Sequence, residues 1–160
     1  MQNLGFRVSA RIAKPVAEVY DAVVNPKKLS GYFTTIGGAS APLVAGTTVT
    51  WWGEVPVEVE ELVPEKKIVL RWDAGVPAGE ALYKTRIEMG FAPLEDGATL
   101  VTIAEGGWHG EAALKKSYLN CEGWTQMLCC MKAWLEHGIN LRQGYYQSEL
   151  KGEPAREPQA

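Results

Sequence analysis

The chain has 160 residues and a formal net charge of −3, with 46% hydrophobic and 22% charged residues. This length fits one domain that is large enough to bury a core without disulfides or structural metal ions. The slightly acidic balance argues against a nucleic-acid-binding surface, and no run of about 18 apolar residues is present that would predict a membrane span.

The first elements are predicted to be a strand followed by two short helices. Apolar and polar residues alternate over residues 6–12, which is typical of a half-buried strand. Pro15 suits the first turn of a helix that runs to residue 24, and Asn25-Pro26 ends it because the residue before proline avoids helical backbone. Residues 26–33 are predicted to form the second short helix.

Five strands are then predicted in succession. They cover residues 47–53, 55–64, 66–74, 81–94 and 97–108. Most of the connections between them are short and carry the Gly, Pro, Asp and Glu residues of tight turns, so the strands should form an antiparallel meander.

A long helix is predicted over residues 110–137, with Gly138 as its left-handed C-cap. Apolar residues follow one stripe at helical spacing. The stripe comprises Leu114, Tyr118, Cys121, Leu128, Met131 and Leu135, with Trp124 and Met127 beside it. Since the sheet is the largest partner available, a curved sheet around this helix would bury both apolar faces. Residues 1–147 are predicted to form one domain, and residues 148–160 a polar tail.

Four segments between residues 6 and 137 carry a resemblance to a known family. They are Pro15–Ala22, Asn25–Leu29 with Tyr32-Phe33, Val59–Trp72 and Glu122-Gly123-Trp124. In this order they resemble the START-like, helix-grip superfamily and, within it, the family named after the activator of the heat-shock-protein-90 ATPase. The resemblance implies an α+β fold. About six antiparallel strands would wrap around a long C-terminal helix, with two short helices after the first strand.

Folds of this superfamily host lipid carriers, hormone receptors and polyketide cyclases, so the resemblance alone does not give the function. The chain has six tryptophans, and adjacent Trp51 and Trp52 are expected to point to opposite faces of their strand. We expect a small, largely hydrophobic ligand in a cavity between sheet and long helix. The predicted ligand-binding residues are Tyr32, Phe33, Trp51, Trp72, Trp108, Tyr118, Glu122 and Trp124.

Two residues are candidates for acid–base chemistry in an alternative, enzymatic reading. His109 follows the last strand, and Glu122 lies one helical turn after Tyr118, so either could move a proton in a cyclase, dehydratase or hydrolase. The simpler interpretations are that His109 is an exposed loop residue and that Glu122 pairs with Arg71 or Arg86. No catalytic motif is assembled in the sequence, which favours binding over catalysis.

The remaining expectations concern partners and location. Cys121, Cys129 and Cys130 are too few and too clustered for a disulfide framework, which indicates buried thiols and a reducing compartment. With only two histidines and three aspartates, no metal site is expected, and no cofactor is expected either. The start of the chain does not resemble a secretory signal, so a cytoplasmic location is expected. A co-chaperone-like interaction module is a further alternative implied by the resemblance, and exposed tryptophans would mark a homodimer face.

Overall fold

The computed structural model describes residues 4–145, which fold into six strands and three helices. In chain order these are β1 (Leu4–Ile12), α1 (Val16–Val24), α2 (Pro26–Tyr32), β2 (Thr48–Trp51), β3 (Val55–Val63), β4 (Lys67–Asp73), β5 (Lys84–Pro93), β6 (Thr99–Trp108) and α3 (Ala113–His137). The predicted order of elements is confirmed. The predicted tail, residues 148–160, lies outside the described residues. None of the described helices is long and apolar enough to cross a membrane.

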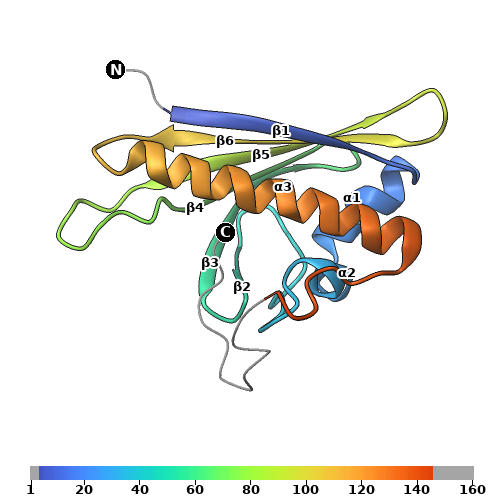
Figure 1. The fold of residues 1–160 in the computed structure, drawn as a ribbon, viewed down its shortest axis with the longest axis horizontal. Helices are drawn as coiled ribbons and strands as arrows, with labels where there is room; N and C mark the ends of the chain where they lie inside the picture. The colour runs from blue at the N-terminus through green and yellow to red at the C-terminus, as the bar shows by residue number, and fades with distance from the viewer. Residues whose placement is uncertain (1–3, 146–160) are drawn as a thin grey trace.

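The six strands form one antiparallel sheet in the order β1-β6-β5-β4-β3-β2. Strands β2 to β6 are the predicted meander, and β1 adds to its far edge beside β6. Helix α3 lies across one face of the sheet, while β2 and β3 run at a steep angle to β1 and β6 (Figure 1). This twist bends the sheet around α3 and gives the helix-grip architecture that the sequence predicted. We call the face covered by α3 the inner face.

Alternation along the strands decides which side chains reach the inner face. Ile68, Leu70 and Trp72 of β4 are buried on it, as predicted. The register between β3 and β4 shifts between Val59 and Glu61, and this bulge lets two consecutive glutamates face outward.

Ion pairs cover the outer face of these strands. Glu60 accepts a hydrogen bond from Arg71 at 3.1 Å, and Glu61 lies 3.2 Å from Lys67. Glu58 pairs with Lys84 in the same row. The glutamates of β3 are therefore matched by cations of neighbouring strands and do not form an unbalanced acidic patch.

Local chemistry explains where the short helices begin. Pro15 is the N-cap of α1, one residue earlier than the predicted first turn. The side chain of Asn25 accepts a hydrogen bond from the backbone N–H of Lys27 at 3.0 Å, and Pro26 occupies the first position of α2. The starts of α1 and α2 thus carry residues that either lack an N–H group or accept a hydrogen bond from one of the free N–H groups.

Helix α3 ends as predicted but is rotated relative to the predicted stripe. Gly138 adopts left-handed backbone, with φ 67° and ψ 24°, and closes the helix. The stripe is wrong at its N-terminal end, because Leu114 and Tyr118 are 51% and 68% exposed. The buried residues are instead Ala113, Ser117, Gly123, Trp124, Met127, Leu128, Cys130 and Met131.

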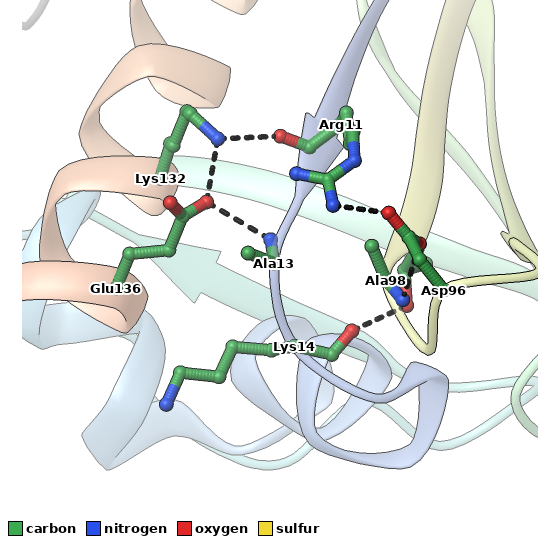
Figure 2. A network of polar contacts seen from close by, with 8 residues as sticks. Arg11, Ala13, Lys14, Asp96, Ala98, Lys132 and Glu136 are labelled. Atoms are coloured by element: carbon green, nitrogen blue, oxygen red, sulfur yellow. Dashed lines mark hydrogen bonds and ion pairs between the residues drawn. The ribbon is translucent and has the colours of Figure 1, made fainter.

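The C-terminal half of α3 is tied to the end of β1 by polar contacts (Figure 2). Lys132 donates to the backbone carbonyl of Arg11 at 2.9 Å and to Glu136 at 2.6 Å. Glu136 also accepts the backbone N–H of Ala13 at 2.9 Å. Lys132 and this N–H lower the pKa of Glu136, so the contact is strongest when its carboxyl group is ionised.

Strand β2 ends at Trp51, and the residue after it departs from the predicted alternation. Trp52 has left-handed backbone, with φ 55°. Both tryptophans are consequently buried, and their rings pack against each other with centroids 5.9 Å apart. The expectation that they point to opposite faces is therefore wrong. Gly37, with φ 79°, packs directly against the backbone of Trp52.

This contact generates a stability prediction. A Cβ atom on Gly37 would lie 2.4 Å from the carbonyl carbon of Trp52, so the backbone must shift in Gly37→Ala. We expect the free energy of unfolding to fall by about 3 kcal/mol or more. The control is Gly46→Ala, which has φ 83° but nothing within 4 Å of the added Cβ atom and should cost only about 1–2 kcal/mol. Urea unfolding measures both, and equal losses would contradict the close contact.

Candidate functional site

A single buried carboxyl group lies at the centre of the inner face. Glu105 on β6 is 2% exposed and is the only Asp or Glu among the buried residues that the structure describes. Its side chain points toward α3 and receives hydrogen bonds from three other elements. We call this arrangement the Glu105 network.

Four donors surround the two carboxyl oxygens. Oε2 accepts the indole N–H of Trp72 on β4 at 2.7 Å and the hydroxyl of Thr85 on β5 at 2.6 Å. Oε1 accepts the indole N–H of Trp124 at 2.7 Å and the amide Nδ2 of Asn120 at 3.0 Å, both from α3. The amide also lies 3.2 Å from Oε2. One side chain thus joins three strands and the long helix.

Two opposing effects act on the ionisation of Glu105. Burial raises its pKa above the ordinary value of 4.5, and the hydrogen bonds from Thr85, Trp72, Trp124 and Asn120 partly offset this rise. Indole N–H groups donate only, so the network satisfies a carboxylate better than a protonated acid. The four donors therefore offset part of the cost of burying the ionised carboxyl group.

Five rings pack next to this network and form what we call the aromatic cluster: Phe33, Trp51, Trp52, Trp72 and Trp124. Phe33 lies at the centre, with ring centroids 4.8 to 5.7 Å from Trp52, Trp124 and Trp51. Trp72 and Trp124 stack at 5.3 Å while both donate to Glu105. The carboxyl group therefore fixes the orientation of two of the five rings.

One polar atom of the aromatic cluster has no partner. The indole Nε1 of Trp51 is buried and makes no hydrogen bond, although Trp51 is 0% exposed. By contrast, Trp52 donates its indole N–H to the backbone carbonyl of Phe33 at 3.2 Å. Buried donors without an acceptor are rare in folded proteins because each one forfeits its bond to water.

A buried cation lies against the same cluster. Arg142, which follows α3, is 2% exposed, and its guanidinium carbon lies 4.9 Å from the ring centroids of Phe33 and Tyr145. It also hydrogen bonds to the thiol of Cys130, which lowers the pKa of that thiol against the larger, raising effect of burial. The three cysteines are free thiols, but only Cys130 is buried. Cys121 is partly buried and Cys129 is exposed, so the expectation of buried thiols is wrong for these two, which lie on other sides of α3.

The predicted ligand-binding residues divide into three groups. Phe33, Trp51, Trp72 and Trp124 are together in the aromatic cluster. Tyr32 is buried but belongs to another contact, since its hydroxyl donates to the carbonyl of Ala22 at 2.9 Å and its ring packs on Trp134.

Trp108 is also buried, but in a separate small cluster. It packs with Ala74 and Ala113 and stacks on Phe6 at 5.8 Å. Its indole Nε1 has no partner either. Because five tryptophans are buried and Trp134 is partly buried, tryptophans do not supply an exposed homodimer face, which was one alternative.

The other candidates lie on the surface. Tyr118 and Glu122 point away from the sheet and line a shallow hollow on the outer side of α3. Glu122 contacts Gln126 at 3.4 Å rather than an arginine. The expected pairing with Arg71 or Arg86 is wrong, because both arginines pair with Glu60.

His109 is exposed, in agreement with the simpler of its two interpretations. Its ring stacks on Tyr83 with centroids 3.9 Å apart, and its backbone N–H donates to the Tyr83 hydroxyl. It makes no described contact with Glu105 or Glu122, so no acid–base pair is assembled from the predicted candidates.

Sequence reasoning missed Glu105, Asn120 and Arg142. For Glu105 a signal was available: Val101, Ile103 and Glu105 share one parity on β6, so a carboxylate stands at a position reserved for core residues. A charged residue at an inward position of a strand indicates a hydrogen-bonded polar centre. Nothing comparable marks Arg142, which lies beyond the helix.

Comparison with known proteins supports the fold. A family model described as "Activator of Hsp90 ATPase homolog 1-like protein" matches residues 13–136. A search of curated proteins found no match.

Solved structures with the same fold come from several organisms. Protein SSP2350 from Staphylococcus saprophyticus is 24% identical, with a TM-score of 0.69 over 87% of this chain and 96% of that one. The Aha1 dimer from Colwellia psychrerythraea is 23% identical, with a TM-score of 0.66 over 88% and 100%. An HSP90 activator from Plasmodium falciparum, PFC0360w, is 15% identical, with a TM-score of 0.65 over 84% and 96%. At these identities the likeness concerns the fold alone.

The Glu105 network predicts unequal effects of two substitutions. Glu105→Leu leaves four donors without an acceptor and should lower the free energy of unfolding by about 3–5 kcal/mol. Glu105→Gln keeps one accepting oxygen and should cost about 1–3 kcal/mol. Glu122→Gln, on the exposed side of α3, is the control and should change stability by less than about 0.5 kcal/mol. Wild-type stability in Glu105→Leu would contradict the network.

The network also predicts a pH dependence. Because the pKa of Glu105 is raised on folding, the folded protein holds more protons than the unfolded chain between pH 4.5 and the folded pKa. The contribution of this group to the free energy of unfolding therefore falls as pH rises through that range. Urea unfolding at a series of pH values should show this fall in wild type but not in Glu105→Gln. Parallel curves for the two proteins would show that the pKa is not raised.

Proposed function

The chain belongs to the Activator of Hsp90 ATPase homolog 1-like family, and from this premise we propose that its domain binds a small, largely hydrophobic molecule between the sheet and α3. The site is the aromatic cluster beside Glu105. The single observation that carries the proposal is the combination of five packed rings with a buried carboxyl group and an unpartnered indole N–H.

Core filling alone does not account for this combination. Leucine and phenylalanine fill protein cores without bringing in an indole donor, whereas an unsatisfied donor or a buried charge costs stability. Trp52 adds left-handed backbone at φ 55°, which is strained for a residue with a large side chain. Strained and unsatisfied groups gather at binding sites because function, rather than stability, retains them.

In this proposal the site opens at edge strand β2. The rings contact one another, so a ligand must replace ring–ring contacts with ring–ligand contacts. Strand β2, which carries Trp51, is an edge strand of four residues that is bonded to β3 on one side. On its other side it is bonded to residues 38–40, where the N–H of Ser40 donates to the carbonyl of Thr50 at 2.9 Å and the N–H of Trp52 donates to the carbonyl of Gly38 at 2.8 Å. A ligand that enters here must separate this segment from β2. Short edge strands separate at lower cost than central strands. Each ring facing the ligand would contribute about 2 kcal/mol.

Glu105 acts in this proposal as a positioning residue. Its oxygens already accept bonds from Trp72, Thr85, Trp124 and Asn120, so it holds two rings of the cluster in place. The enzymatic alternative with Glu122 or His109 has less support, because both side chains are exposed and lie on different elements.

A second candidate function comes from the family itself. The family description and the HSP90 activator of similar fold point to stimulation of a chaperone ATPase. The outer face of β3 to β5 would then be a contact surface, but its charges are already paired within the chain. An ATPase assay with a chaperone of the Hsp90 class tests this candidate, and stimulation without any hydrocarbon binding would favour it over the ligand-binding proposal.

Ligand binding predicts a specific effect of removing the central ring. Wild type should bind the hydrocarbon fluorene with quenching of tryptophan fluorescence, and Phe33→Leu should weaken binding about three- to tenfold because the contact between the Phe33 ring and the ligand is lost. The control is Phe91→Leu, which removes an equally buried ring that contacts Tyr20 on the α1 side of the core. It should bind fluorene as wild type does.

Failure has a clear signature in the same titration. Two negative results together would contradict the proposed function. Fluorene would cause no saturable quenching of wild type, and native mass spectrometry of protein purified from cells would find no retained apolar molecule. Equal weakening by Phe33→Leu and Phe91→Leu would show that the effect comes from general destabilisation rather than from the aromatic cluster.

A further inference from the structure

We infer that the ligand is a neutral ring compound carrying a hydrogen-bond acceptor, such as a ketone or ether oxygen, and that the indole N–H of Trp51 binds this acceptor. The inference rests on the proposed function and specifies its ligand class. The ligand class is inferred from which polar groups of the aromatic cluster already have hydrogen-bond partners.

Three of the four indole N–H groups in the cluster have partners. Those of Trp72 and Trp124 donate to Glu105, each at 2.7 Å, and that of Trp52 donates to a backbone carbonyl at 3.2 Å. Trp51 Nε1 is the remaining donor, and it is buried without an acceptor. The one open hydrogen-bonding position among these described rings is therefore a donor, which a ligand can satisfy only with an acceptor.

Glu105 disfavours the other ligand classes. Its two oxygens accept from four side chains, so no acceptor position remains for a ligand N–H or O–H group. In its ionised form, Glu105 would also repel an anionic ligand in a site of low dielectric constant. Arg142, the cation near Phe33, is engaged by the Cys130 thiol and the Tyr145 ring. A neutral acceptor fits all three conditions.

The position of Trp51 supports this assignment. It lies on edge strand β2, where the site is proposed to open, and its ring contacts those of Phe33, Trp52 and Trp72. A ligand that enters at this edge must separate residues 38–40 from β2, and it would then contact the Trp51 ring. Its acceptor would restore the hydrogen bond that the indole loses on burial.

The test compares two probes of nearly identical shape, fluorenone and fluorene, which differ by one carbonyl oxygen. Wild type should bind fluorenone about three- to tenfold more tightly than fluorene, which is the effect of one neutral hydrogen bond. Trp51→Phe keeps an aromatic ring but lacks the N–H, and it should bind both probes equally. The matched control is Trp108→Phe, since Trp108 also has a buried, unpartnered N–H but lies in the other cluster. This control should keep the preference for fluorenone.

The outcomes separate this inference from the proposed function. If wild type binds both probes equally, or if Trp51→Phe keeps the preference, the acceptor inference is wrong while ligand binding stands. Loss of the preference in Trp108→Phe alone would place the ligand in the other cluster and overturn the assignment. Binding of neither probe by wild type overturns the inference together with the proposed function.

A second measurement does not depend on the folding of a variant. In wild type labelled with nitrogen-15, fluorenone should move the indole proton resonance of Trp51 downfield, as expected for a new hydrogen bond, whereas fluorene should not. An unchanged Trp51 resonance in the presence of saturating fluorenone would contradict the assignment even if Trp51→Phe cannot be purified.

Discussion

The hydrogen-bonded carboxyl group of Glu105 sets how the long helix sits on the sheet. It joins β6 to β4, β5 and α3 through four donors, and a buried charge tolerates little displacement of them. Asn120 and Trp124 must face the sheet to reach it, and small residues at Ala113 and Ser117 continue that side of the helix. The rotation of α3 about its axis is therefore set by the hydrogen bonds to Glu105 as well as by the burial of apolar side chains.

This constraint divides the molecule into fixed and openable parts. Near Glu105 the helix is held by the network, and near its C-terminus Lys132 and Glu136 hold the end of β1. At the opposite edge, β2 has a strand partner on one side only, and it carries the one ring of the aromatic cluster with a free donor. The proposed site thus combines a wall oriented by Glu105 with an edge that must open for a ligand to enter.

Sequence reasoning predicted the fold because its signals are local. Alternation gave the strands, Asn25-Pro26 separated the two short helices, and Gly138 ended α3. The site was less accessible to it. Hydrophobic spacing alone placed Leu114 on the buried side of α3. Such spacing does not reveal that a carboxyl group on an earlier strand, Glu105, requires Asn120 and Trp124 to face the sheet. Likewise, alternation could not anticipate the burial of Trp52, which depends on left-handed backbone after β2.

The central claim, that one carboxylate orients the helix and two rings, can be measured by nuclear magnetic resonance. Following the side-chain carboxyl carbon of Glu105 and the indole protons across a pH series monitors the network directly. The account predicts that the indole resonances of Trp72 and Trp124 shift with the same midpoint as this carbon, and that this midpoint lies above 4.5, while Trp51 does not follow it. Indole resonances of Trp72 and Trp124 that are insensitive to the titration of Glu105 would contradict it.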